Sequence, residues 1–322
     1  MTSKMTPKNV PPPQLTMTDI IIIGAGPAGL TAGIYARRAE KSVLILEKGA
    51  FGGQMTFSPQ IDNYPGIPSA SGVEIADRMV EQALSLGVEI EVEEVVSVDE
   101  GSEPDYIKRV TCESGEVYEA RAVIIAAGAE HRHLGVPGED AHIGAGISFC
   151  AVCDGAFYRG RNVAVVGGGN SALQEALMLS GVCGRVTILQ NLPTLTGEQA
   201  LRDAVEVRDN IDVICSVTVA EVLSADDGAF GGLVIEHADT GDRETVSCDG
   251  AFVAIGLAPK NAPFESVTSL DEAGYILSDE SCFCETPGVF VAGDCRTKSV
   301  RQITTAVSDG AAAALAACRF LG

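Results

Sequence analysis

The chain of 322 residues is long enough for two domains of ordinary size. Its 44 acidic and 22 basic side chains give a formal net charge of −22, which argues against proteins that bind nucleic acid or anionic membranes through a basic face. No apolar segment approaches the roughly 18 residues of a membrane span, and residues 1–17 lack the apolar core of a signal peptide. We therefore expect a flexible extension over 1–17 and a cytoplasmic protein that binds neither nucleic acid nor membrane.

Strands, glycine loops and helices alternate in the first part of the chain. The isoleucine-rich run 19–23 predicts a buried parallel strand, GAGPAG follows at 24–29, and residues 28–38 predict a helix. This order is a β-α-β unit. Further strands are predicted over 43–46, 88–98, 107–112, 116–118 and 123–126, with a helix over 73–86.

The same order recurs from residue 162 onward. A strand over 162–166 leads into GGGNSA at 167–172 and then a helix over 173–179. Later strands are predicted over 186–189, 212–217, 232–237, 252–255 and 289–291, and the alanine-rich last 20 residues predict a helix.

This repeat predicts an α/β fold of two Rossmann-like, three-layer dinucleotide-binding domains, the second inserted into the first. Residues 18–130 and 258–322 are expected to form the first domain, and residues 131–257 the second.

The first glycine loop has the spacing and context of a dinucleotide site. Gly24 allows the tight turn, Gly26 lets a pyrophosphate approach the backbone, and Gly29 lets the helix pack on the strand. Glu47 lies 18 residues after Gly29, at the end of the next strand, where an acid accepts hydrogen bonds from ribose hydroxyls.

The second glycine loop predicts a weaker nucleotide site. An acid at the end of the following strand favours NAD and nearby arginines favour the 2′-phosphate of NADP, but residues 190–196 contain neither. NADPH is therefore disfavoured. Two interpretations stay open: a site in which Gln190 and Asn191 bond the 2′-hydroxyl of NADH, or a relic that binds no nicotinamide. The residues of this site are Gly167, Gly169, Asn170, Ser171, Ala172, Gln190 and Asn191.

Cys150 and Cys153 form a C-x-x-C pair that Asp154 follows directly. Such a pair forms and breaks a disulfide readily, which indicates redox chemistry. A zinc site needs two more ligands of suitable spacing, so we expect no metal. A pair of unreactive thiols is the remaining alternative. Asp154 is either a helix N-cap or a group that exchanges a proton with a thiolate, and burial is expected to raise its pKa.

Taken in order from about residue 18 to residue 321, these motifs resemble the low-molecular-weight thioredoxin reductases, two-domain FAD/pyridine nucleotide-disulfide oxidoreductases. The basic HRRxxxR run that binds NADPH in that family is replaced here at Gln190, Asn191, Leu192 and Thr196, so the chain resembles the subgroup that lacks it. The FAD residues that the resemblance implies are Gly24, Gly26, Pro27, Ala28, Gly29, Glu47, Lys48, Gly53, Gln54, Asn63, Ala127, Gly128, Gly293, Asp294, Arg301, Gln302 and Ile303.

The resemblance also implies an activity. Electrons pass from a donor through FAD to the Cys150–Cys153 disulfide and on to thioredoxin or a similar small dithiol protein, with Cys153 next to the flavin, Cys150 as interchange thiol and Asp154 as acid and base. It further implies a homodimer, rotation of the inserted domain about linkers at 129–134 and 256–260, and NADH, ferredoxin or a deazaflavin as donor rather than NADPH.

Three alternatives remain open from the sequence. They are a dithiol oxidase that uses oxygen on the same fold, a non-enzymatic flavin redox sensor, and a structural zinc protein. The sequence assigns no role to Cys282, Cys284 and Cys295, which gather near the C-terminal FAD motif.

Overall fold

The computed structural model describes residues 17–58, 60–101 and 107–322. They divide into two compact units. The first unit takes Met1–Phe51, Val80–Ala127 and Asn261–Gly322, and the second takes Gly52–Met79 and Gly128–Lys260. The predicted extension over 1–17 lies outside the described residues, apart from Met17, which begins the first strand. The predicted domain boundaries remain a prediction.

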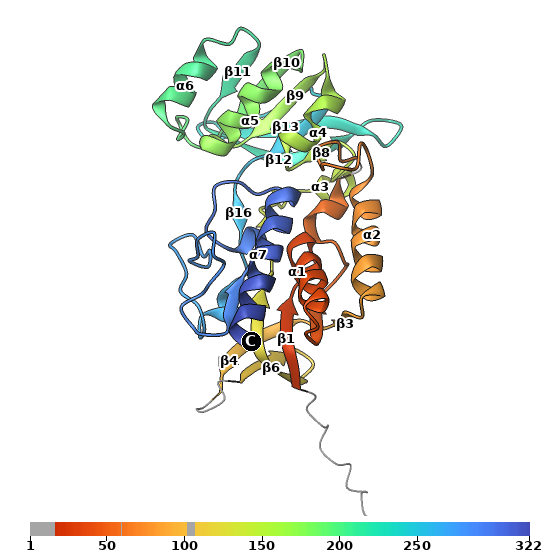
Figure 1. The fold of residues 1–322 in the computed structure, drawn as a ribbon. Coiled ribbons are helices and arrows are strands. Elements are labelled where there is room, and N and C mark those ends of the chain that lie inside the picture. The colour runs from red at the N-terminus through yellow and green to blue at the C-terminus, as the bar shows by residue number, and fades with distance from the viewer. Residues whose placement is uncertain (1–16, 59, 102–106) are drawn as a thin grey trace, which may run out of the picture. The chain divides into compact units, whose positions relative to one another are not determined.

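The first unit is built on a seven-stranded sheet (Figure 1). Its strands lie in the order β3-β2-β1-β6-β5-β4, and β17 pairs with β6. The strands are β1 (Met17–Ile23), β2 (Val43–Glu47), β3 (Glu89–Val92), β4 (Val95–Glu100), β5 (Lys108–Cys112), β6 (Val117–Ile125) and β17 (Val289–Val291). β1, β2, β3, β6 and β17 run parallel, whereas β4 and β5 are antiparallel to their neighbours.

Strand β6 corrects the sequence prediction. Segments 116–118 and 123–126 were expected to be separate strands, but Val117–Ile125 is one strand with two sets of partners. Its first half pairs antiparallel with β5, and its second half runs parallel to β17. The charged residues that interrupt the apolar pattern of β6 lie near the point where its partner changes from β5 to β17. The predicted strand 88–98 is in turn divided into β3 and β4.

The two faces of this sheet are covered by different layers. Ile21 and Ile23 of β1 pack with residues of β4 and β5, while the alternate residues Ile20 and Ile22 face the other way. On that second face α1 (Pro27–Arg38) and α7 (Ile303–Leu321) lie side by side (Figure 1). Helix α2 (Gly72–Ser85) continues from the second unit into the first.

The second unit repeats this plan. A parallel sheet in the order β11-β10-β9-β15-β8 carries α5 (Asn170–Ser180) and α6 (Gln199–Glu206) on one face, and an antiparallel sheet β12-β13-β14 packs on the other. Its strands are β8 (Ile147–Ser148), β9 (Asn162–Val166), β10 (Arg185–Leu189), β11 (Ile211–Ile214), β12 (Val217–Ser224), β13 (Phe230–His237), β14 (Arg243–Val246) and β15 (Gly250–Val253). Val163 and Val165 face the helices, whereas Ala164 and Val166 face the antiparallel sheet.

Short elements complete both units. A two-stranded ribbon of β7 (Glu130–His131) and β16 (Leu257–Ala258) joins the segments predicted as linkers. The remaining elements are η1 (Gly53–Phe57), α3 (Glu139–His142), α4 (Ala151–Asp154), η2 (Gly155–Tyr158), η3 (Ala262–Phe264) and η4 (Gly293–Cys295).

The α/β class with two Rossmann-like units is confirmed, and several elements of the second unit differ from the prediction. Strands β8 and β14 were not predicted, and the strand predicted over 252–255 lies at Gly250–Val253. The predicted strand 212–217 is two strands, because Ser216 adopts a φ of 56° in the left-handed region and turns the chain between β11 and β12. Helix α6 was not predicted, since its sequence is short and mostly polar. Among the described helices, none combines the length and apolar character that a membrane crossing requires.

Candidate active site

The first glycine loop turns from β1 into α1 at the carboxyl edge of the first sheet. A Cβ atom on Gly24 would lie 2.4 Å from the backbone oxygen of Ala126, and one on Gly29 would lie 1.9 Å from the oxygen of Gly24. A Cβ on Gly26, in contrast, would meet no atom within 4 Å. Two glycines are therefore needed for packing, and the middle one leaves the backbone open to a ligand.

Glu47, at the end of β2, ties the adjacent strand to this loop. Its Oε2 accepts a hydrogen bond of 2.6 Å from the amide of Ala25, and its Oε1 accepts one of 2.9 Å from Gly49. Lys48 follows and is exposed. The predicted acid thus stands beside the glycine loop, as a ribose-binding residue must.

The C-terminal motif lies against the same loop. Gly293 has a φ of 82°, and a Cβ on it would lie 2.9 Å from the Cβ of Ala28. Asp294 follows, and its buried Oδ1 has no hydrogen-bond partner. Arg301 donates to the backbone oxygen of Asp294 over 3.4 Å and stacks on Tyr275.

The remaining predicted FAD residues divide between the units. Gln302 caps α7 through a capping box with Thr305, and Ile303 begins that helix. Ala127 belongs to the first unit, whereas four predicted residues belong to the second: Gly53, Gln54, Asn63 and Gly128. The structure thus brings the first glycine loop, the Gly293–Asp294 motif and Glu47 together within one unit. That the four residues of the second unit belong to a flavin site stays a prediction.

The two cysteines form a disulfide at the start of α4, with a Cα–Cα distance of 5.3 Å. Cys150 is the N-cap of this short helix: its sulfur accepts a hydrogen bond from the amide of Cys153 over 3.2 Å. Both cysteines are half-buried, and Val152 between them is exposed. The pair therefore stands at a surface that a partner can reach.

Asp154 ends α4 and is almost fully buried. Its Oδ2 accepts a hydrogen bond of 2.6 Å from Ser148, and its Oδ1 has no partner. Burial raises the pKa of Asp154, and the Ser148 hydroxyl opposes that rise only in part. Cys150 is the N-cap of α4, and Asp154 occupies the N-cap position of η2 without a capping hydrogen bond to its side chain. The expected rise in the pKa of Asp154 with burial is confirmed.

A second carboxyl group lies under the same helix. Glu175 of α5 accepts a hydrogen bond from the backbone of Ala151, between the two cysteines, and its Oε2 is buried without a partner. Burial raises the pKa of Glu175 to about 7. Sequence analysis missed this residue because nothing in the local pattern distinguishes it from a surface glutamate of an amphipathic helix.

The second glycine loop borders a cavity of about 650 Å³ at the carboxyl edge of the second sheet. Gly167–Ser171 line one side, and Arg132 and His133 reach its rim from the β7 segment. Sequence analysis did not place Arg132 here, because the linker and the loop meet only in the folded unit. Ala172 lies within α5 and is buried.

Gln190 does not present its amide freely to this cavity. The side chain is 3% exposed and packs on Gly168, where an added Cβ would lie 2.5 Å from its amide carbon. Its Nε2 donates to the oxygen of Thr194 over 3.3 Å, and its Oε1 accepts from the amide of Asn191 over 3.1 Å. The segment after β10 is therefore folded onto the glycine loop. The predicted hydrogen bond from Gln190 to a ribose would have to compete with these hydrogen bonds inside the segment.

Similar proteins confirm the family that the motifs predicted. A family model described as pyridine nucleotide-disulphide oxidoreductase matches residues 18–310. The chain is 41% identical over 303 residues to the thioredoxin reductase of Listeria monocytogenes, covering 94% of this chain and 93% of that protein.

Two solved structures extend the likeness. The thioredoxin reductase of Streptococcus pyogenes is 39% identical, with a TM-score of 0.89 over 96% of this chain and 99% of that one. That of Lactococcus lactis, in the FR conformation, is 38% identical with a TM-score of 0.65 over 94% and 99%. This chain belongs to the pyridine nucleotide-disulphide oxidoreductase family.

Members of this family are disulfide oxidoreductases that use a flavin and a pyridine nucleotide, and this chain is one of them. The residues of the first unit fit a flavin dinucleotide. Gly26 leaves the space that a pyrophosphate needs, and the unpartnered Oδ1 of Asp294 offers an acceptor to a ligand hydroxyl.

The other cysteines near the C-terminal motif pack in the core. Cys282 and Cys295 are fully buried, and their thiols donate to the backbone oxygens of Asp309 and Ile125. Burial raises the pKa of Cys282 to about 11 and that of Cys284 further. Among the described residues, no group of three or more metal-ligating side chains is placed to hold an ion.

Two substitutions in the first loop separate packing from binding. Gly29→Ala is expected to prevent folding of the first unit, because its Cβ meets backbone at 1.9 Å. Gly26→Ala is expected to fold but to lose at least about tenfold in flavin affinity, since the methyl group enters the ligand's space. Circular dichroism and flavin fluorescence titration measure both effects. Equal flavin affinity of Gly26→Ala and wild type would contradict this assignment.

The buried Glu175 predicts a pH-dependent stability. Its pKa is about 7 in the fold against 4.5 when unperturbed, so the folded state holds the extra proton between these values. The resulting stabilisation is present below pH 4.5 and is lost as the pH rises through 7. Glu175→Gln removes this dependence, so wild type should lose up to roughly 3 kcal/mol relative to the variant between pH 4.5 and 8. Urea denaturation across this range measures the difference.

Glu206→Gln, at the exposed end of α6, is the matched control for this series. Its free energy of unfolding should follow that of wild type at each pH. A constant difference between wild type and Glu175→Gln would show that Glu175 does not hold a proton in the fold.

Proposed function

We propose that this protein is a thioredoxin-reductase-type flavoenzyme. It passes electrons from a donor through FAD to the Cys150–Cys153 disulfide and on to a disulfide of thioredoxin or a similar small protein. The observation that carries this proposal is the disulfide itself, closed across two residues beside the buried carboxyl of Asp154. The thioredoxin reductases at about 40% identity over nearly the whole chain support the choice of substrate.

FAD is the flavin that the first unit suits, because its glycine loop and Glu47 are those of a dinucleotide site. Gly26 would receive the pyrophosphate, Glu47 a ribose and Asp294 a hydroxyl of the ribitol chain. When bound, FAD supplies the two electrons that reduce the disulfide.

The dithiol then performs two exchanges. Two electrons break the Cys150–Cys153 bond, and two protons are needed to give two thiols. Asp154 is placed to supply one of them, because burial keeps its carboxyl protonated to higher pH than usual. Cys150, as thiolate, attacks the substrate disulfide, forms a mixed disulfide and releases one substrate thiol. Cys153 then attacks the sulfur of Cys150, which releases the second substrate thiol and restores the Cys150–Cys153 bond.

A moving second unit would let one dithiol serve two partners. The predicted linkers meet in the β7–β16 ribbon, which the Lys260–Glu130 ion pair of 2.7 Å and the Arg132–Gly256 hydrogen bond also join. Paired linkers can carry a rotation as one piece. Two relatives of nearly equal identity differ widely in TM-score, 0.89 against 0.65, which supports more than one arrangement in the family.

The donor is proposed to be other than NADPH. A 2′-phosphate would meet Gln190 and Asn191, which carry no charge and bond each other. Arg132 also lines this cavity, and we propose that it acts on the pyrophosphate, which NADH and NADPH share, and so does not select NADPH. NADH, reduced ferredoxin and a deazaflavin are the candidates. We further propose a homodimer in the cytoplasm, the reducing compartment in which dithiol enzymes of this kind work.

The roles of the dithiol predict distinct variants. Cys150→Ser should abolish thioredoxin reduction, while the donor should still bleach the flavin absorbance. Asp154→Asn should retain the disulfide but slow turnover by roughly 10- to 100-fold, since a proton donor is lost. Steady-state reduction of thioredoxin measures both rates. Full turnover by Cys150→Ser would refute the dithiol mechanism.

The donor is identified by anaerobic flavin bleaching with NADH, NADPH and reduced ferredoxin at equal concentration. NADPH should be slowest by at least about tenfold, because Gln190 and Asn191, which we propose meet its 2′-phosphate, carry no charge. The variant Asn191→Arg/Leu192→Arg/Thr196→Arg should raise the NADPH rate and leave the ferredoxin rate unchanged. Fast bleaching of wild type by NADPH would contradict the proposal, and turnover only from dithiol to oxygen would favour a dithiol oxidase.

A further inference from the structure

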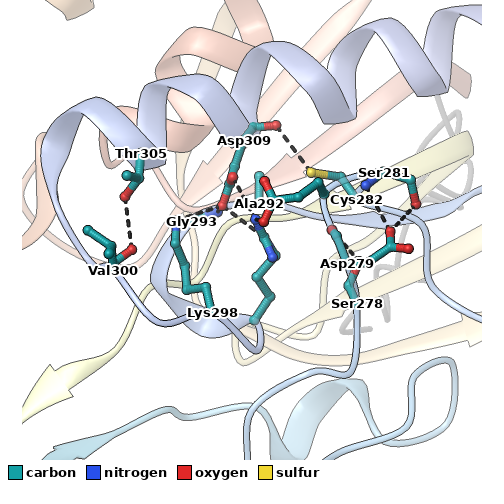
Figure 2. A network of polar contacts seen from close by, with 12 residues as sticks. Ser278, Asp279, Ser281, Cys282, Ala292, Gly293, Lys298, Val300, Thr305 and Asp309 are labelled. Carbon is teal, nitrogen blue, oxygen red and sulfur yellow. Dashed lines mark hydrogen bonds and ion pairs between the residues drawn. The ribbon is translucent and has the colours of Figure 1, made fainter.

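A buried ionic network holds the turn that follows β17 (Figure 2). Its centre is Asp309, in the second turn of α7, whose carboxylate accepts four hydrogen bonds. Oδ2 accepts from the amide of Gly293 over 3.0 Å, from Nε of Arg296 over 2.9 Å and from Nζ of Lys298 over 2.9 Å, and Oδ1 accepts from Nη2 of Arg296 over 2.9 Å. The arginine pair is therefore bidentate.

All three charged side chains of this network are withdrawn from water. The side chains of Arg296, Lys298 and Asp309 are exposed by 2%, 5% and 5%. Glu280 also meets Arg296, over 3.3 Å, but its side chain is 91% exposed and screened by water. Two buried cations thus face one buried carboxylate, which leaves one positive charge in excess.

The excess positive charge, at Lys298, acts on the carboxyl group of Asp294. Burial raises the pKa of Asp294 above its usual value and the Asp309 carboxylate adds to that rise, whereas Lys298 and Arg301 oppose it. Its Oδ1 is buried without a partner, so the carboxylate retains a free acceptor. Lys298 therefore stands between two carboxylates, one that it bonds directly and one whose charge it stabilises.

The network fixes the backbone as well as the charge. Gly293 is held from both sides, by the Asp309 carboxylate at its amide and by Ala28 of the first glycine loop, 2.9 Å from where its Cβ would be. Cys282 donates to the backbone oxygen of Asp309 over 3.7 Å and so joins the segment that meets β17 at the Phe283–Phe290 bridge to the same point of α7. The Gly293–Asp294 turn thus has little freedom to move.

We propose that Asp309, with Arg296 and Lys298, is a positioning residue for the flavin: it orients the Gly293–Asp294 turn so that the unpartnered carboxylate oxygen of Asp294 can accept from a hydroxyl of FAD. This inference rests on the proposed FAD site of the first unit. Nothing in the local sequence around the motif marks Asp309, which lies 16 residues after Gly293.

The test measures the FAD dissociation constant of the apoprotein by flavin fluorescence, from pH 5 to pH 9. Asp309→Asn should weaken FAD binding by at least about tenfold, because it leaves two buried cations without their carboxylate. Lys298→Gln should weaken it several-fold at pH 7 and more strongly toward pH 5, since Asp294 then takes up a proton more readily. Lys298→Arg should restore both the affinity and the pH profile of wild type.

Lys108→Gln is the matched control, because it removes a fully buried lysine that pairs with Glu100 over 2.9 Å in the β4–β5 layer of the same unit. It should bind FAD as wild type does. If Asp309→Asn does not fold, the comparison of Lys298→Gln with Lys298→Arg still tests the proposal.

Wild-type affinity of Lys298→Gln at every pH would overturn the proposed role, as would an equal loss of affinity in Lys108→Gln. Absence of saturable FAD binding by wild type is a separate outcome, and it would refute the flavin site itself.

Discussion

The close approach of backbone to backbone at the carboxyl edge of each parallel sheet is the constraint on which both sites depend. In the first unit a Cβ on Gly24 would lie 2.4 Å from the oxygen of Ala126, and in the second a Cβ on Gly167 would lie 2.5 Å from the oxygen of Ala254. The same contact, between a glycine loop and the end of the neighbouring strand, thus occurs twice. This contact holds the ends of the two strands close together and leaves the following amides of the loop facing outward, toward a nucleotide.

The two edges share this geometry and differ in chemistry. At the end of the second strand the first unit has Glu47, which bonds the glycine loop through the amide of Ala25 and keeps a carboxylate there. The second unit has Gln190, whose amide group makes hydrogen bonds within its own segment and packs against Gly168. The loop therefore packs in the same way in both units, while the side chain at the end of the second strand bonds an amide of the loop only in the first unit.

The sequence predicted those features whose cause is local. The strands Asn162–Val166 and Val289–Val291 agree with the prediction to the residue, because buried parallel strands are continuous apolar runs bounded by glycine loops. The glycine spacing and the C-x-x-C pair carry their chemistry in a few adjacent residues. The single strand β6 could not be predicted, since its two halves are joined by continuous pairing with β1 while they pair with β5 and β17 on the other edge.

Buried polar partners were the largest omission. Glu175 meets the backbone of Ala151, 24 positions earlier in the sequence, and Asp309 meets Gly293, 16 positions earlier. Each occurs in a helix whose sequence alone fits a solvated charge. Only the packing of that helix decides that the carboxyl group is withdrawn from water and which backbone amide it accepts from.

Asp154 and Glu175 are the two buried carboxyl groups near the dithiol. Their placement affects how a protein of net charge −22 accepts electrons. Burial raises the pKa of both Asp154 and Glu175, and among the described residues no cation contributes to either shift. Reduction of the disulfide adds two negative charges unless protons accompany the electrons. A cation beside the sulfurs would stabilise thiolates directly. A protonated carboxyl instead passes its proton to sulfur and becomes a carboxylate, and the local charge returns to its starting value only when that carboxylate takes up a proton from solvent. The surroundings of α4 therefore favour reduction in which electrons and protons arrive together.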